Sequence, residues 1–198
     1  MNKIFGFISS LTGSICVFLF LIGLVFGLDK LSYFVCMILS FAYVCVTCAF
    51  YPECDDKLKG VSLGSIAISS IYSVFVSLVY FTQLTTILHK NGPDQFMQAL
   101  AFVPGTWIFY LDLFGYAIMA LSTLLLGFVV DESEKVLRLL LKIHGLFFPV
   151  CICMPMITTF QGNGSSTAGT YGLIGWCLFF LPILSLSTYH FYKGMNSQ

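Results

Sequence analysis

Charged side chains are scarce in this sequence. Asp, Glu, Lys and Arg make up 9% of the 198 residues, and the formal net charge at neutral pH is zero. A water-soluble domain carries about 25% charged residues, so the composition excludes an ordinary soluble fold. The lack of a basic excess excludes nucleic acid as a partner, and the high apolar content excludes a disordered chain.

Motifs for cofactors and metals are missing as well. The chain contains no P-loop, no convincing dinucleotide-binding fingerprint and no H-E-x-x-H zinc motif. Its three histidines, His89, His144 and His190, do not share a helix face, and a lone histidine in a span is typical of packing. We therefore expect no cofactor, no metal site and no catalytic residues, and an enzyme is the less favoured interpretation.

Apolar residues dominate what is present. Hydrophobic side chains make up 58% of the chain, with 21 Phe and 10 Tyr. A transmembrane helix needs roughly 20 mostly apolar residues. The predicted fold is therefore all-α, a polytopic transmembrane helix bundle of six spans that forms a single domain over residues 1–198. The predicted spans are residues 4–28, 31–51, 61–88, 106–130, 143–160 and 171–191.

The basic residues indicate how this bundle is oriented. One side of the predicted membrane carries Lys3, Lys57, Lys59, Lys135, Arg138, Lys142 and Lys193, and the other carries Lys30 and Lys90. The excess of basic residues in short loops marks the cytoplasmic side. We therefore expect a multi-pass protein of the plasma (cytoplasmic) membrane, with both termini in the cytoplasm.

One ionisable residue, Asp112, lies inside a predicted span. It falls about six residues from the outer start of the fourth span, which is roughly 9 Å at 1.5 Å per residue. Tyr116, Met119 and Thr123 follow at helical spacing, so one helix face carries a carboxylate, a phenol and a hydroxyl. An ionisable group inside a membrane is costly, which makes Asp112 the first functional candidate.

The third predicted span supplies partners for Asp112. Tyr80 and Gln83 lie one turn apart, and the antiparallel course of the two spans puts Gln83 at about the depth of Asp112. We expect Tyr80 and Gln83 to hydrogen-bond Asp112 and, with Tyr116, to form a ligand-binding pocket in the outer half. A carboxyl group removed from water suits proton coupling or a cationic or hydroxylated ligand. The alternative is that the cluster only satisfies buried polar groups between helices.

Small residues mark a packing surface on the same span. Ser65, Ser69, Ser73 and Ser77 repeat every four residues, a pattern that lets two helices approach closely. We interpret this serine stripe as helix packing. It is also where a homodimer would form if the protein transports a solute.

Two further segments flank the fourth span. Lys135, Arg138 and Lys142 recur at i, i+3 and i+7 on an apolar helix, and we expect them to contact anionic lipid headgroups. The alternative is snorkelling at a helix end. On the other side, residues 89–105 form a long loop, for which a short interfacial helix or a lid is the alternative to a packed loop.

Three segments resemble a known family: YFTQL at residues 80–84, FYLDLFGYAIMALSTLLLG at residues 109–127 and KVLRLLLKIHGL at residues 135–146. Together they resemble an uncharacterised family of prokaryotic six-span integral membrane proteins. In that family an aromatic-Gln-Leu element precedes an acidic residue in a Gly-Tyr helix, and a basic cytoplasmic helix follows. The resemblance implies a six-span fold in a bacterial cytoplasmic membrane and implies no activity. It singles out Gln83, Asp112 and Tyr116 as site positions.

Three function classes follow from these patterns. The leading hypothesis is an integral membrane protein that binds or passes a small solute or proton through the outer-half pocket. The alternative is a non-catalytic membrane sensor or assembly component whose basic helix docks lipids or a partner protein. An intramembrane enzyme acting on a lipid would need a second acid or base, or a metal, and the sequence offers neither.

Overall fold

The computed structural model describes residues 1–89, 94–161 and 166–196, and within these ranges the chain forms helices and no strand. The helices are α1 (Asn2–Phe26), α2 (Asp29–Phe50), α3 (Lys59–Thr82), α4 (Asp94–Leu100), α5 (Trp107–Val129), α6 (Lys135–Gly145), α7 (Phe147–Gln161) and α8 (Ser166–Asn196). Two short 3₁₀ turns, η1 (Tyr51–Glu53) and η2 (Asp56–Leu58), link α2 to α3, and α3 continues into a π-helical turn, η3 (Gln83–Ile87). Six helical segments are long and apolar enough to cross a membrane. The predicted all-α membrane fold with six spans is therefore confirmed.

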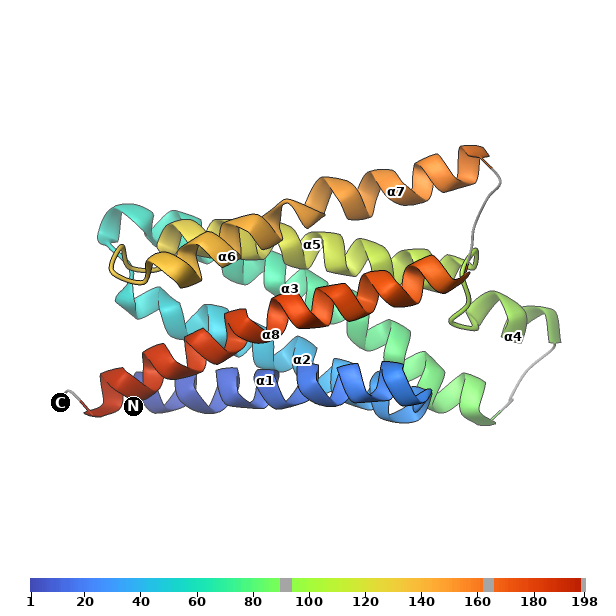
Figure 1. Cartoon of the computed structure of the whole chain (residues 1–198), viewed down its shortest axis with the longest axis horizontal. Helices are drawn as coiled ribbons and strands as arrows, with labels where there is room; N and C mark the ends of the chain where they lie inside the picture. The colour runs from blue at the N-terminus through green and yellow to red at the C-terminus, as the bar shows by residue number, and fades with distance from the viewer. Residues whose placement is uncertain (90–93, 162–165, 197–198) are drawn as a thin grey trace.

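The contacts between the six spans form a closed ring, and Figure 1 shows their helices running side by side along the bundle. Helix α1 packs against α2 and α8, α2 against α3, and α3 against α5. Helix α5 then packs against α6 and α7, and contacts between α6 and α8 close the ring. The core is made of side chains that point into this ring, among them Tyr43, Tyr72 and Phe180.

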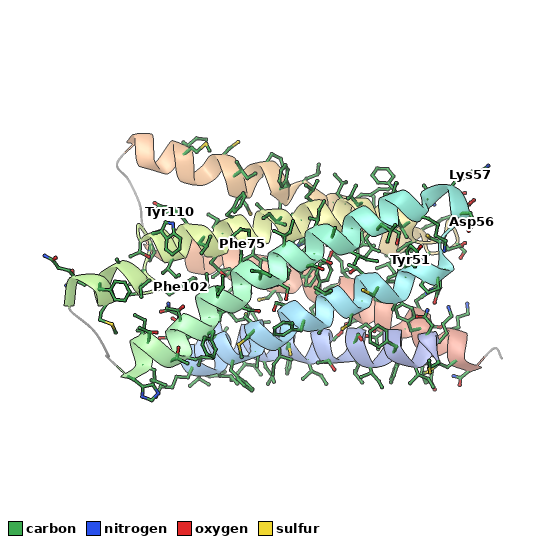
Figure 2. All side chains as sticks on the ribbon, turned by 180° about the vertical axis from the view of Figure 1, so that it is seen from behind. Tyr51, Asp56, Lys57, Phe75, Phe102 and Tyr110 are labelled. Carbon is green, nitrogen blue, oxygen red and sulfur yellow. The ribbon has the colours of Figure 1, made fainter. Side chains whose placement is uncertain are left out.

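Both chain ends lie at the same end of the bundle, together with the links between α2 and α3 and between α5 and α6 (Figure 1). We call this the terminal end and the opposite one the distal end. The distal end carries the turn between α1 and α2 and the short helix α4. Figure 2 shows the same division, with Tyr51, Asp56 and Lys57 at the terminal end and Phe102 and Tyr110 at the distal end.

A glycine makes the tight turn between α1 and α2. Gly27 ends α1 in the left-handed region, with φ of 66°, and its backbone N–H donates to the Gly23 carbonyl. A left-handed residue closes a helix without strain only if it lacks a Cβ. Helix α2 can therefore begin two residues later, at Asp29.

The fifth span differs from its predicted bounds. It was expected over residues 143–160, but the helical segment begins earlier: α6 (Lys135–Gly145) and α7 (Phe147–Gln161) together contain the predicted range, and Lys135–Cys153 is long and apolar enough to cross a membrane. Leu137 and Leu141 of α6 are 1% exposed, because they form one helix face that points into the ring. The basic helix is thus the start of a span, and its charged residues occupy the face and the end that point away from the core.

The serine stripe of α3 is used inside the chain. Ser65 donates to the backbone carbonyl of Ser122 in α5, and Ser122 donates to that of Ser65, both at 2.9 Å. Ser69 and Ser73 pair with hydroxyl groups of α2 at 3.0 and 3.2 Å. The predicted packing role is confirmed, and a homodimer would need a different surface.

Candidate functional site

Four buried side chains near the distal end form what we call the distal polar cluster: Cys36 of α2, Tyr80 of α3, and Asp112 and Tyr116 of α5. The Tyr80 hydroxyl donates to Asp112 Oδ2 at 3.2 Å and lies 3.4 Å from the Tyr116 hydroxyl. That hydroxyl in turn lies 3.8 Å from Cys36 Sγ. The structure therefore brings together three of the four predicted pocket residues.

The carboxylate of Asp112 is only half satisfied. Its side chain is 3% exposed, and Oδ1 is fully buried without a hydrogen-bond partner in the described part of the chain. None of the ion pairs among the described residues involves Asp112. Leaving a buried charge unpaired costs several kcal/mol. The site therefore needs a proton, a cation or a hydrogen-bond donor at Oδ1.

Aromatic rings surround the cluster. Tyr33 of α2 stacks on Tyr80 with 5.6 Å between ring centroids, and Trp176 of α8 meets Tyr116 edge to face at 4.9 Å. Tyr72, about two turns further into the bundle on α3 than Tyr80, has its ring centroid 6.0 Å from that of Tyr116. These rings exclude water from the carboxylate and strengthen any electrostatic interaction there.

The predicted hydrogen bond between Gln83 and Asp112 is wrong. Gln83 Nε2 donates to the Leu100 carbonyl at 2.8 Å, and Gln83 Oε1 accepts from the Phe102 N–H at 3.0 Å. The first of these backbone groups belongs to the last residue of α4 and the second lies two residues beyond it, where the helix supplies no partner. A primary amide carries a donor and an acceptor side by side and satisfies both, so the loop takes Gln83 away from Asp112.

The segment held by Gln83 covers the distal polar cluster. Phe102 lies 5.9 Å from Tyr33, 6.0 Å from Tyr80 and 5.4 Å from Phe109, measured between ring centroids. Helix α4 confirms a short helix within residues 89–105, of which 90–93 lie outside the described residues. The loop thus packs the aromatic ring of Phe102 against Tyr80.

His144 is a packing residue, as the sequence indicated. Trp176 Nε1 can only donate, so His144 Nε2 accepts at 2.9 Å. The other ring nitrogen, Nδ1, then carries the proton and donates to Thr123 Oγ1 at 2.7 Å. Both nitrogens are satisfied inside the bundle, so His144 has no free position for a ligand.

The basic stripe on α6 has partners within the chain. Arg138 forms an ion pair with Glu132 at 3.1 Å, and Lys142 Nζ lies 4.4 Å from the centre of the Phe128 ring. Lys135 is exposed. Contact of the three basic residues with lipid headgroups stays a prediction.

A second polar group, at the terminal end, was not predicted. This terminal ionic cluster consists of Lys3, Glu53, Glu134 and His190. Glu53 Oε2 accepts from Lys3 Nζ at 2.7 Å and pairs with His190 Nε2 at 2.8 Å, while His190 Nδ1 lies 3.0 Å from Glu134 Oε1. An imidazole between two carboxylates can donate to both only when it carries both protons. The four residues come from four separate segments, so the cluster ties the terminal end together.

A cavity of about 210 Å³ adjoins this cluster. Its lining consists of Phe50, Glu53, Val129, Val130, Asp131, Ser133 and His190. Hydrogen bonds from the hydroxyl and the backbone N–H of Ser133 lower the pKa of Asp131. One signal in the sequence points to this site, because Lys3, Glu53 and Glu134 lie at the same side of their spans, but spacing alone does not pair them.

A short motif of glycine and serine lies at the start of α3. Residues 60–64 read G-V-S-L-G, so the G-x-S-x-G spacing of serine hydrolases, which was expected to be absent, is present. That motif acts from a sharp turn between a strand and a helix. Here Ser62 is buried within the first turn of α3, and its hydroxyl has no partner in the described part of the chain. The spacing therefore does not form a nucleophile elbow.

The fold and the distal polar cluster define the class of this protein: an all-helical integral membrane protein with an ionisable group buried between its spans. In the described ranges no three His, Cys, Asp or Glu side chains are placed to hold a metal ion. Comparison of the chain with protein-family models, with curated proteins and with solved structures finds no match.

Proposed function

We propose that this protein binds or passes a proton or a small cationic solute at Asp112, in the plasma membrane and with both termini cytoplasmic. The observation that carries the proposal is the Asp112 carboxylate, which is 3% exposed, has one oxygen without a partner and meets no cationic side chain among the described residues. Ionisable groups of this kind mark ion and proton pathways in membrane proteins.

The neighbours of Asp112 fit this role. Tyr80 holds one carboxylate oxygen and leaves the other for the ligand. The aromatic faces of Tyr33, Tyr80 and Tyr116 suit a cation, because the ring quadrupole attracts positive charge. Gln83 acts indirectly, since it holds the segment that places Phe102 over the cluster. Lys135, Arg138 and Lys142 would anchor the cytoplasmic side to anionic lipids.

Thermal unfolding in detergent tests the proposal without knowledge of the activity. We would compare wild type with Asp112→Asn, and with Asp29→Asn as a matched control, because Asp29 is exposed at the start of α2. The probes are sodium, potassium, methylammonium and choline. A ligand at 100 times its dissociation constant stabilises the folded state by about 2.7 kcal/mol.

Each outcome separates the alternatives. A cation that raises the midpoint of wild type and Asp29→Asn but not of Asp112→Asn identifies a cation site. If no cation raises the midpoint of wild type and Asp112→Asn is as stable as wild type, the carboxyl of Asp112 holds a proton, because the asparagine amide mimics the neutral carboxyl. If Asp112→Asn is much less stable than wild type and Asp29→Asn, and no cation raises any midpoint, Asp112 only packs the helices together and the proposal is wrong.

A further inference from the structure

Asp112 lies near one end of its helix. It is five residues from Trp107, where α5 begins at the distal end, and seventeen residues from Val129, where α5 ends. At 1.5 Å per residue, these separations are about 8 Å and about 26 Å along the helix axis. The side chain is 3% exposed, so a proton or cation reaches it only when some part of the bundle moves. The shorter route between the carboxylate and solvent therefore runs through the distal end.

The ring of Phe102 closes this shorter route. Phe109 lies one turn from Asp112 on α5, toward the distal end, and the Tyr80 hydroxyl donates to Asp112. Phe102 packs against both of these residues, with its ring centroid 5.4 Å from that of Phe109 and 6.0 Å from that of Tyr80. Figure 2 shows Phe102 at the distal end of the bundle. Phe102 therefore lies between the distal solvent and the residues next to Asp112.

Phe102 belongs to a segment that packs loosely on the bundle. We call this segment, residues 95–106, the distal cover. Its first half consists of residues 95–100 of α4, and none of their side chains is buried. The Thr106 hydroxyl lies 2.8 Å from the carbonyl oxygens of both Ala101 and Val103, which ties the second half to the start of α5. A segment with few buried contacts opens at a low cost in free energy.

Gln83 joins the distal cover to the end of α3. It is 4% exposed and is the first residue of η3, and single π-helical turns occur frequently at functional sites. Its side-chain amide donates to the Leu100 carbonyl at 2.8 Å and accepts from the Phe102 N–H at 3.0 Å. The bonds of Thr106 stay within the cover, whereas those of Gln83 cross to another helix. Breaking two bonds at one side chain therefore frees the backbone of the cover from α3 while the cover remains attached to α5.

We propose that the distal cover is a lid, that Gln83 is its latch, and that Asp112 exchanges its proton or cation with the distal side. The proposal rests on the proposed function and adds the side from which Asp112 is reached. In the closed arrangement the ring of Phe102 excludes water from the distal polar cluster. When Gln83 releases Leu100 and Phe102, this ring leaves Tyr80 and the distal route opens. Gln83 is thus a positioning residue, because it acts on the cluster only through Phe102.

The native thiol of Cys36 tests whether this route opens. Cys36 is 0% exposed, and its Sγ lies 3.8 Å from the Tyr116 hydroxyl inside the distal polar cluster. The full chain in lipid nanodiscs would be treated with a water-soluble methanethiosulfonate, and the rate of labelling at Cys36 would be measured by peptide mass spectrometry. We expect Gln83→Leu to raise this rate about tenfold or more, because the closed lid loses two hydrogen bonds, and Phe102→Ala to raise it as well. The matched control is Gln98→Leu, since Gln98 is exposed on α4 and its replacement should leave the rate unchanged.

A second native thiol separates opening of the lid from general loosening of the bundle. Cys54 is 7% exposed and follows η1 at the terminal end, far from the lid. Faster labelling of Cys36 with unchanged labelling of Cys54 supports the lid. If Gln83→Leu labels Cys36 no faster than wild type does, or accelerates both thiols equally, Gln83 is not a latch and the proposal is wrong. Labelling does not depend on binding at Asp112, so the cation titration of Asp112→Asn decides the proposed function separately.

Discussion

Replacing Gly145 with alanine should destabilise the bundle, because α6 and α5 are closest at this residue. A Cβ on Gly145 would lie 2.5 Å from Leu124 Cβ and 3.1 Å from Leu124 Cα. These atoms are fixed to the backbone and cannot rotate away, so the helices must separate. Overpacking costs about 1–3 kcal/mol, and the better helix propensity of alanine returns at most about 1 kcal/mol. An approach of 2.5 Å lies at the costly end of that range, so we expect a net loss of about 2 kcal/mol.

The assay is unfolding of the purified protein in mixed micelles, followed by circular dichroism. The control is Gly175→Ala in α8, where an added Cβ meets no atom within 4 Å, and this variant should be unchanged or slightly more stable. The comparison tests whether α6 is part of the membrane bundle or an amphipathic helix on its surface. Equal stability of Gly145→Ala and wild type would refute the packing of α6 against α5.

Three further predictions concern hydrogen bonds and charge. Trp176→Phe leaves the buried Nε2 of His144 without a donor and should lower the free energy of unfolding by about 1–3 kcal/mol; an unchanged thermal midpoint would contradict the assigned bond. Gln83→Leu frees the backbone after α4, so hydrogen exchange of the Phe102 amide should accelerate by about tenfold, and exchange at the wild-type rate would show that Gln83 does not hold the segment. Glu134→Gln removes one carboxylate from the terminal ionic cluster. Because the members of this cluster are partly exposed, the free energy of unfolding should fall by about 1 kcal/mol or less, and by less at high salt. A loss that does not depend on salt would indicate a cause other than charge.

The sequence predicts the fold well because the bilayer leaves few alternatives. A run of about 20 apolar residues satisfies its backbone in a membrane only as a helix, so five of the six spans fall close to their predicted bounds. The helix of the fifth span begins eight residues before its predicted start, for a local reason. Residues 135–142 mix leucine with basic residues, and hydropathy does not distinguish a surface helix from the charged end of a span. The burial of Leu137 and Leu141 shows that α6 belongs to a span. That burial depends on contacts of α6 with α5 and α8, which hydropathy does not describe.

The candidate site was predictable in part. Helical spacing places Tyr116 one turn from Asp112, and the antiparallel arrangement brings Tyr80 to the same depth. The partner of Gln83 depends on the loop backbone after α4, which no periodicity describes. The terminal ionic cluster was missed because His190 and Glu53 are 137 residues apart in sequence.

The closure of the ring by α1 and α8 has a consequence for biosynthesis. Helix α1 leaves the ribosome before α8, so it completes its contacts only when α8 has been made, and the ion pair between His190 and Glu53 forms only then. Before α8 is made, lipid can cover the face of α1 that α8 later contacts, and this costs little free energy because helices in a membrane are not driven together by water. A chain that stops before α8 should therefore insert, persist as an open five-helix arc, and expose to lipid and to quality-control proteases the surface that α8 covers in the finished protein.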